Sequence, residues 1–425
     1  MGARVGALGG LLALLATPAP AVAMRWHPPV QLGGAAAVGD QSSLADAIMA
    51  TSPGGNVVVA WSGRTGIELA TASRRLRFKR PMVVPESAKA DEPALALGDR
   101  GDVLVEWGYR FRCHHSGCEG VRAIARSAAG RWTAPQTVSE PGQYQYPIGA
   151  AVDEHGRRAA MVGTLNGGSR LFLAPPDGPF DRTPVVSGAR FIRLVTFRRS
   201  GSIAVTYEWR RALWEQRRST GGVVERPRRL LDGIGYDLRE VAGDRSGAAV
   251  ALLDRSDGAQ RHRLLMFTRG GGVLRHVREL DRNSGDRTWT PALAVNRSGA
   301  AVVAWKVTAE ARGHAGALRA IVRRAGHDFG RPSTLQDDSS RPVGAYDAAM
   351  APGGTAVVAW RSLRPNGSQG IYASISRHGR GFGRPRLISA RRPGVFSDPA
   401  VGMTPGGHAV VSWIRGLTVE AARLF

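Results

Sequence analysis

The sequence is poor in the residues with which many enzymes carry out their chemistry. It has only two cysteines, and of its 58 lysines and arginines only Lys79, Lys89 and Lys306 are lysine. None of these lysines follows a glycine, which excludes a phosphate-binding P-loop. There is also no G-x-S-x-G elbow, no H-E-x-x-H motif and no EF-hand loop. The sequence therefore predicts no cofactor and no metal, and it identifies no catalytic residue.

Long apolar runs are missing after the first residues of the chain. Residues 1–23 combine a basic start, a short apolar run and the site Ala21-Val22-Ala23, which is typical of a secretory signal peptide. The run is too short to span a bilayer comfortably. We therefore expect a mature chain of residues 24–425 without a transmembrane segment, secreted or associated with the cell envelope.

Acidic residues are too few to balance the arginines, so the formal net charge is +24. This excess could attract an anionic cell-envelope polymer, or it could reflect the codon usage of a GC-rich genome. The arginines are spread along the chain, and the aromatic residues are not interleaved with them as a base-stacking platform. We therefore expect no specific nucleic-acid partner.

A pattern of turn glycine, valine-rich strand and tryptophan recurs about every 45–55 residues, which indicates a repeat architecture. Its clearest copies are residues 300–305, 355–360 and 408–413. The turn glycines are Gly55, Gly101, Gly156, Gly201, Gly247, Gly299, Gly354 and Gly407. They predict eight repeats, with seven as the alternative because the third to fifth repeats are irregular.

Each repeat contains four short apolar segments, as expected of a four-stranded β-propeller blade. The last repeat stops after its third strand, at residues 417–425, whereas residues 26–32 match the fourth-strand pattern. We therefore predict an all-β chain with a single propeller domain at residues 24–425. Its N-terminal strand would complete the C-terminal blade and close the ring, and we expect a monomer.

Large aromatic residues end the valine-rich strands, where neighbouring blades would pack against each other. A buried tryptophan removes up to about 250 Å² from water, so these positions are expected to be structural. The predicted inter-blade residues are Trp61, Trp107, Trp305, Trp360 and Trp413.

Polar residues recur where the innermost strand of each repeat is expected to begin, which would place them around one mouth of the axial channel. They could hydrogen-bond a ligand there, or they could cap the preceding turns through backbone N–H groups. The candidate binding residues are Asp46, Glu92, Tyr146, Asp237, Thr290, Asp347 and Asp398.

The densest group of reactive side chains is Cys113-His114-His115-Ser116-Gly117-Cys118. In an exported protein, two cysteines five positions apart favour a disulfide over a zinc site. We therefore predict a disulfide between Cys113 and Cys118.

The strand Gly299 to Trp305 and the segment Phe329 to Pro332 resemble those of secreted β-propeller repeat proteins of GC-rich bacteria. A looser likeness is to sialidase-type propellers, whose S-x-D-x-G-x-T-W turn is similar to residues 284–289. That segment lacks the central Gly-x, and the Arg-Ile-Pro signature of the family has no counterpart. No catalytic residue is therefore carried over from the sialidases.

Together these features predict a non-enzymatic extracellular binding or scaffold protein, because function lies in sites placed on a fold and no catalytic motif is present. A glycan, an anionic cell-envelope polymer or a protein is the expected partner. The alternative is a divergent glycoside hydrolase or lyase that uses channel-mouth carboxylates such as Asp347 and Asp398.

Overall fold

The valine-rich segments beside the turn glycines form β-strands in the computed structural model, and the described residues contain no helix. The structure describes residues 24–36, 47–88, 90–112, 117–139, 145–164, 168–186, 191–198, 200–233, 238–244, 246–256, 261–270, 272–284, 291–307, 317–337, 342–390 and 394–425. None of these residues belongs to a helix long and apolar enough to cross a membrane. Residues 1–23, where the sequence predicts a signal peptide, lie outside the described ranges.

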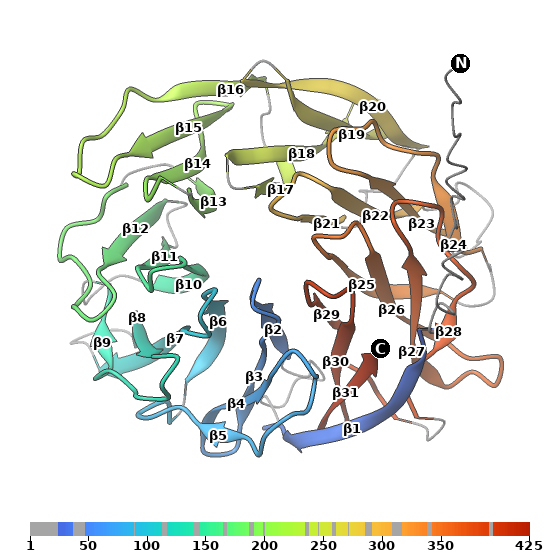
Figure 1. Cartoon of the computed structure of the whole chain (residues 1–425), viewed down its shortest axis with the longest axis horizontal. Helices are drawn as coiled ribbons and strands as arrows, with labels where there is room; N and C mark the ends of the chain where they lie inside the picture. The colour runs from blue at the N-terminus through green and yellow to red at the C-terminus, as the bar shows by residue number, and fades with distance from the viewer. Residues whose placement is uncertain are drawn as a thin grey trace, which may run out of the picture.

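The strands form eight antiparallel sheets arranged as blades around a central axis, which confirms the predicted propeller and its blade number (Figure 1). Blade 1 contains β2 (Ile48–Thr51), β3 (Val57–Gly63), β4 (Gly66–Ala72) and β5 (Met82–Val83), and blade 2 contains β6 (Asp91–Leu97), β7 (Val103–Arg112), β8 (Gly117–Arg126) and β9 (Gln136–Thr137). Blade 3 contains β10 (Gln145–Val152), β11 (Arg158–Thr164) and β12 (Ser169–Ala174), and blade 4 contains β13 (Phe191–Phe197), β14 (Ile203–Trp209), β15 (Ala212–Arg218) and β16 (Arg228–Asp232). Blade 5 contains β17 (Leu238–Asp244), β18 (Gly247–Ser256), β19 (Arg261–Gly270) and β20 (Val273–Ser284), and blade 6 contains β21 (Ala292–Val295), β22 (Ala301–Val307), β23 (Ala317–Arg323) and β24 (Ser333–Gln336). Blade 7 contains β25 (Val343–Met350), β26 (Ala356–Leu363), β27 (Gln369–Ser376) and β28 (Arg386–Leu387), and blade 8 contains β29 (Ala400–Met403), β30 (Ala409–Arg415), β31 (Thr418–Leu424) and β1 (Trp26–Gly34).

Blade 3 is the least regular blade of the ring. It has three named strands, and the place of the fourth is taken by an isolated bridge between Leu171 and Val186. The bridge is extended by backbone hydrogen bonds from Asp181 to Leu173 and from Val185 to Leu171. The fourth layer of this blade is therefore present, although it is short.

The first strand of the chain and its last three strands together form blade 8. Strand β1 pairs with β31, with Trp26 opposite Leu424 and Gly34 opposite Thr418, so the order of this sheet is β1-β31-β30-β29. The predicted closure of the ring by the N-terminal strand is confirmed. Closure covers β31, which would otherwise be the outer edge of a three-stranded blade, and β1 becomes the outer strand of this blade.

The turn between the first and second strand of each blade depends on its glycine. All eight predicted turn glycines have a positive φ, for example 79° at Gly354 and 80° at Gly407. Side chains other than glycine rarely adopt this conformation, because the Cβ approaches the backbone. In blade 7 the turn is closed by hydrogen bonds from Ala351 to Thr355 and from Gly354 to Ala351.

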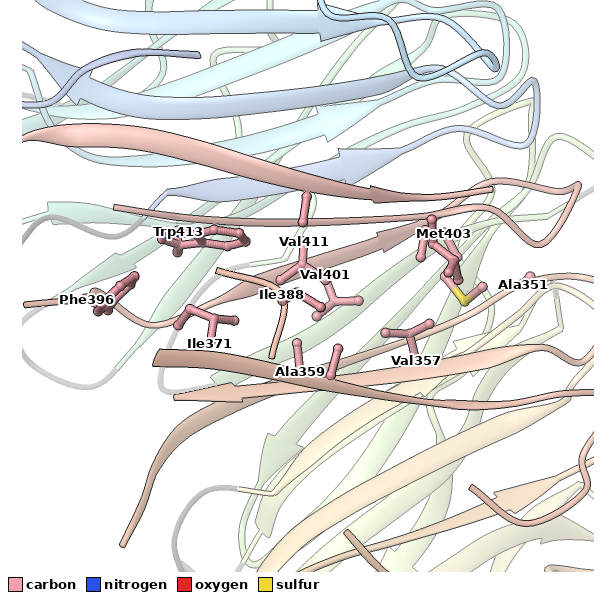
Figure 2. Close-up of a cluster of buried hydrophobic side chains, with 14 residues drawn as sticks. Ala351, Val357, Ala359, Ile371, Ile388, Phe396, Val401, Met403, Val411 and Trp413 are labelled. Carbon is pink, nitrogen blue, oxygen red and sulfur yellow. The ribbon is translucent and has the colours of Figure 1, made fainter. Parts of the chain in front are cut away.

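The core consists of apolar layers between neighbouring blades, and five of these layers contain a fully buried tryptophan. Trp413 of blade 8 belongs to one buried cluster with Val357, Ala359 and Ile371 of blade 7 (Figure 2). Trp61 of blade 1 packs in the same way against blade 8. The exposed fractions of Trp61, Trp107, Trp305, Trp360 and Trp413 are 0–1%.

Replacing Trp360 with alanine is expected to lower the free energy of unfolding by about 3–5 kcal/mol, because the substitution opens a cavity between blades 6 and 7. It also removes the hydrogen bond that the Trp360 indole donates to Gln336. Denaturant unfolding followed by circular dichroism measures the loss. The control is Val223→Ala at a side chain that is 69% exposed, and its effect should stay within about 0.5 kcal/mol. A loss at Trp360 no larger than that of the control would contradict the assigned packing.

Candidate functional site

The inner strands of the blades surround the axis of the ring, and their direction defines its two ends, which we call mouths (Figure 1). These strands are β2, β6, β10, β13, β17, β21, β25 and β29. At the hairpin mouth each inner strand turns into the second strand of its blade at the turn glycine. At the strand-start mouth each inner strand begins. The chain departs from its repeat pattern at both mouths.

The residue after the tryptophan position lies at the strand-start end of each blade, and its chemistry divides the ring into two halves. The charged residues lie in blades 4 to 7 and the uncharged residues in the other four blades. From blade 1 to blade 8 these residues are Ser62, Gly108, Gly163, Glu208, Asp254, Lys306, Arg361 and Ile414. A packing requirement common to all blades would not produce this asymmetry, so the charged half is a candidate site.

Arginines from neighbouring strands complete this charged half by ion pairing. Arg193 Nε lies 2.6 Å from Glu208 Oε1, and Arg239 Nη2 lies 2.6 Å from Asp254 Oδ2. Both arginines sit where the register of an inner strand shifts, and such a bulge redirects the side chain. The arginine side chains are 37% and 28% exposed, whereas the carboxylates are 11% and 0% exposed. The arginines are therefore the accessible members of these two ion pairs, and the carboxylates that fix their position are buried.

A third ion pair joins blades 7 and 8 at the same mouth. Arg361 Nη2 lies 3.3 Å from Asp398 Oδ1, and Arg361 Nη1 donates to the Phe396 carbonyl at 2.6 Å. The side chains of Arg361 and Asp398 are 30% and 46% exposed. We call the residues of these three pairs, together with Lys306, the charged arc.

Two carboxylates lie one layer further along the channel, at equivalent positions of blades 5 and 7. The strand registers place the following residues in this layer from blade 1 to blade 8: Ile48, Ala94, Gly149, Leu194, Glu240, Ala292, Asp347 and Ala400. Only Glu240 and Asp347 in this layer carry a charge.

The two carboxylates of this layer have different surroundings. Asp347 Oδ2 accepts a hydrogen bond of 2.7 Å from the Val401 amide of blade 8, and its Oδ1 accepts one of 2.7 Å from the Ala348 amide. Burial nevertheless raises the pKa of Asp347 to about 6. Burial also raises the pKa of Glu240 to about 7, with Arg193 opposing this rise and Asp347 adding to it. Asp347 thus links two blades, whereas Glu240 is poised to change its charge near neutral pH.

The raised pKa of Glu240 gives a signed prediction for stability. Its folded pKa of about 7 exceeds the ordinary value of 4.5, so the folded state binds the proton more tightly than the unfolded chain. This contribution to stability is complete below pH 4.5 and is lost as the pH rises towards 7. Glu240→Gln should therefore stabilise the protein at pH 8 by on the order of 1–3 kcal/mol and have little effect at pH 4.

Denaturant unfolding of wild type and Glu240→Gln at both pH values measures this difference. Glu225→Gln changes the same charge at an exposed position and serves as the control. An equal effect of Glu240→Gln at the two pH values would contradict the assigned ionisation.

The hairpin mouth is crossed by an ion pair. Arg297 follows the inner strand of blade 6, and Asp99 follows that of blade 2, on the opposite side of the ring (Figure 1). Arg297 Nη1 lies 2.6 Å from Asp99 Oδ2, and the second nitrogen of the guanidinium contacts Oδ1. A cavity of about 230 Å³ lies beside this pair and is lined by Asp153, Glu154, Arg198 and Asp244, among others. The ion pair therefore bridges this mouth of the channel.

Only some of the residues predicted from the sequence fall in the described ranges. Asp347 and Asp398 belong to neighbouring blades at the strand-start mouth, and Tyr146 in β10 is 41% exposed. Glu92 lies in β6, but its side chain is not among those described. Asp46, Asp237 and Thr290 lie outside the described residues.

The predicted disulfide is also left untested. Cys113 lies outside the described residues, as does the side chain of Cys118. Residues 285–289 of the sialidase-like turn lie outside them as well. Among the described residues, no three His, Cys, Asp or Glu side chains are grouped so that they could hold a metal ion.

Sequence reasoning missed Glu240 and most of the charged arc, because it considered only where the inner strands begin. The signal was present one residue after each tryptophan position, where blades 4 to 7 change from small or apolar to charged residues. The arginine partners carried no such signal, because their placement depends on bulges in β13 and β17.

Comparison with known proteins adds no family assignment. No protein-family model matches the chain, and no curated protein matches its sequence. A protein of unknown function from Dyadobacter fermentans is 10% identical, with 94% of this chain and 98% of that chain covered and a TM-score of 0.41. The S511A mutant of puromycin hydrolase is 13% identical, with 88% of this chain and 59% of that chain covered and a TM-score of 0.48. A fungal alcohol oxidase of the AA5 family is 12% identical, with 94% and 99% covered and a TM-score of 0.46. These likenesses are too distant to carry an argument about function.

Proposed function

We propose that the protein is a non-enzymatic extracellular binding or scaffold protein whose ligand contacts the charged arc. The observation that carries this proposal is the asymmetry of the strand-start mouth, where the residue after the tryptophan position is charged in blades 4 to 7 and uncharged in the other four blades. A binding site combines a few directed polar groups with an otherwise regular frame. The partly exposed guanidinium groups of Arg193, Arg239 and Arg361 supply such directed donors.

The ligand we propose is a glycan or a cell-envelope polymer with hydroxyl and anionic groups. Guanidinium groups held by ion pairs with carboxylates offer several N–H donors in a set geometry, which suits both kinds of group. The signal-peptide pattern in residues 1–23 and the charge of +24 support a site of action outside the cell.

The partners of the mouth carboxylates favour binding over catalysis. Asp347 accepts two backbone amides, and Asp398 pairs with Arg361. The two carboxylates that a glycoside hydrolase or lyase would use are therefore engaged in contacts within the protein. Glu240, with its pKa of about 7, is the group that the enzymatic alternative would need as an acid or base.

The test is a glycan-array screen of the protein at low and moderate salt, together with a turnover assay on the same sugars. We expect saturable binding of particular glycans without turnover. Arg361→Ala should weaken this binding about tenfold, because a charge-assisted hydrogen bond is lost. The matched control is Arg386→Ala, which removes the same charge from the exposed outer strand β28 and should leave binding unchanged.

Each other outcome has a defined meaning. Turnover that disappears in Glu240→Gln would replace the proposal with the enzymatic alternative. Binding that falls equally in both arginine variants would assign it to overall charge instead of the arc. A lack of response to every sugar would refute the proposed ligand class.

A further inference from the structure

One buried position of the second strand breaks the repeat in blade 3. This position is the second residue after the turn glycine. In the six blades whose second and third strands pair there in the same way, the residue at this position is apolar. These residues are Val57, Val103, Ile203, Ala301, Ala356 and Ala409, with exposed fractions of 0–6%. In blade 3 the position is Arg158, which is only 3% exposed.

A buried guanidinium group is costly unless it is paired and hydrogen-bonded. Arg158 Nη2 donates to the carbonyls of Pro175 and Gly178 at 2.7 and 2.5 Å. Its Nε is buried and has no hydrogen-bond partner among the described residues. Asp102 and Asp177 lie near enough to oppose the lowering of its pKa by burial. The protein groups around Arg158 therefore satisfy only part of its donor capacity.

Arg158 lines a cavity of about 300 Å³ between blades 2 and 3, on the face of the hairpin turns. Arg126, Arg131 and Trp132 line the same cavity. Its lining also includes Asp177 and the ion pair of Arg100 with Asp102, so arginines outnumber carboxylates there. No hydrogen bond or ion pair joins the side chains of Arg126 and Arg131 to the described residues, and Arg126 Nε is buried without a partner. The cavity thus combines an aromatic wall with guanidinium groups that retain free donors.

Blade 6 has an equivalent turn in which the arginine makes a different set of contacts. Arg323 and Phe329 form the bridge that Arg126 and Trp132 form in blade 2. The Arg323 guanidinium stacks on Phe329 at 5.1 Å, and its Nη2 donates to the Gly299 carbonyl at 2.8 Å. Arg126 has no corresponding bond, and its guanidinium lies 6.0 Å from the Trp132 ring. The Nε atoms of Arg323 and Arg126 are both buried without a partner among the described residues. The two turns therefore differ in the bond donated by the Arg323 Nη2 and in Arg158, because the other blades have an apolar residue at the Arg158 position.

We propose that this cavity binds the oxyanion group of a small molecule or of one polymer residue, with Arg158 and Arg126 as its donors and Trp132 as its wall. A carboxylate, sulfate or phosphate group accepts charge-assisted hydrogen bonds from guanidinium groups. A volume of about 300 Å³ accommodates such a group together with a body the size of a sugar ring. This site lies on a different face and in different blades from the charged arc, so it stands independently of the proposed function.

The test is calorimetric titration of the protein with sodium sulfate, phosphate and glucuronate, at an ionic strength held constant with sodium chloride. We expect saturable one-site binding of at least one of these anions. Arg158→Val restores the residue type of the other blades, so it should fold normally and weaken binding about ten- to hundredfold. Arg126→Gln should weaken binding as well.

The matched control is Arg323→Gln, which removes the same charge from the equivalent turn of blade 6 and should leave binding unchanged. The proposal is overturned if wild type responds to none of the three anions beyond chloride. It is also overturned if binding survives in both Arg158→Val and Arg126→Gln, or if Arg323→Gln weakens it as much as they do. A selective response to glucuronate would identify a sugar acid, and a selective response to sulfate or phosphate would identify an ester of that acid.

Discussion

The packing of one blade against the next is the constraint on which the rest of the molecule depends. Each blade is too thin to bury its apolar residues alone, so the second strand covers one neighbour with alternate residues and the other neighbour with the rest. In blade 1, Val57, Val59 and Trp61 contact blade 8, whereas Val58 and Ala60 contact blade 2. Every blade is therefore stabilised by both of its neighbours, and the pairing of β1 with β31 completes the last blade of the ring.

Because the packing between blades fixes the residue type at most buried positions, a buried position that differs from its equivalents in the other blades points to a local role. The interface between blades 2 and 3 contains two departures. Besides Arg158, Glu106 is fully buried where blades 1, 6 and 7 have Ala60, Ala304 and Ala359. Burial raises the pKa of Glu106 well above its ordinary value, with the backbone amide of Met161 opposing the rise. A neutral carboxyl group is the form that such surroundings tolerate.

The strand-start mouth shows how polar residues are fitted to a rigid ring. Asp254 and Glu208 are nearly inaccessible, yet each is neutralised by an arginine from the adjacent inner strand. The arginines reach this position because the inner strands bulge, and a bulge is tolerated where a strand faces the channel instead of a packed neighbour. Two of the three ion pairs of the charged arc therefore follow from local irregularity in a fold that is otherwise repetitive.

The sequence by itself determined the class of fold and the closure of the ring, and it favoured eight blades over seven. These follow from local signals, namely the glycines at the turns, the alternation within strands and the tryptophans that end them, and each signal acts within a few residues. Gly354 and Trp360 could be interpreted without knowing what lies beside them. Only the tertiary structure decided which polar residues meet. Arg297 and Asp99 are 198 positions apart in sequence, and Arg158 meets Arg126 in a shared cavity only because two blades are neighbours. Side-chain proximity of this kind depends on ring geometry and bulges, which leave no periodic trace in the sequence.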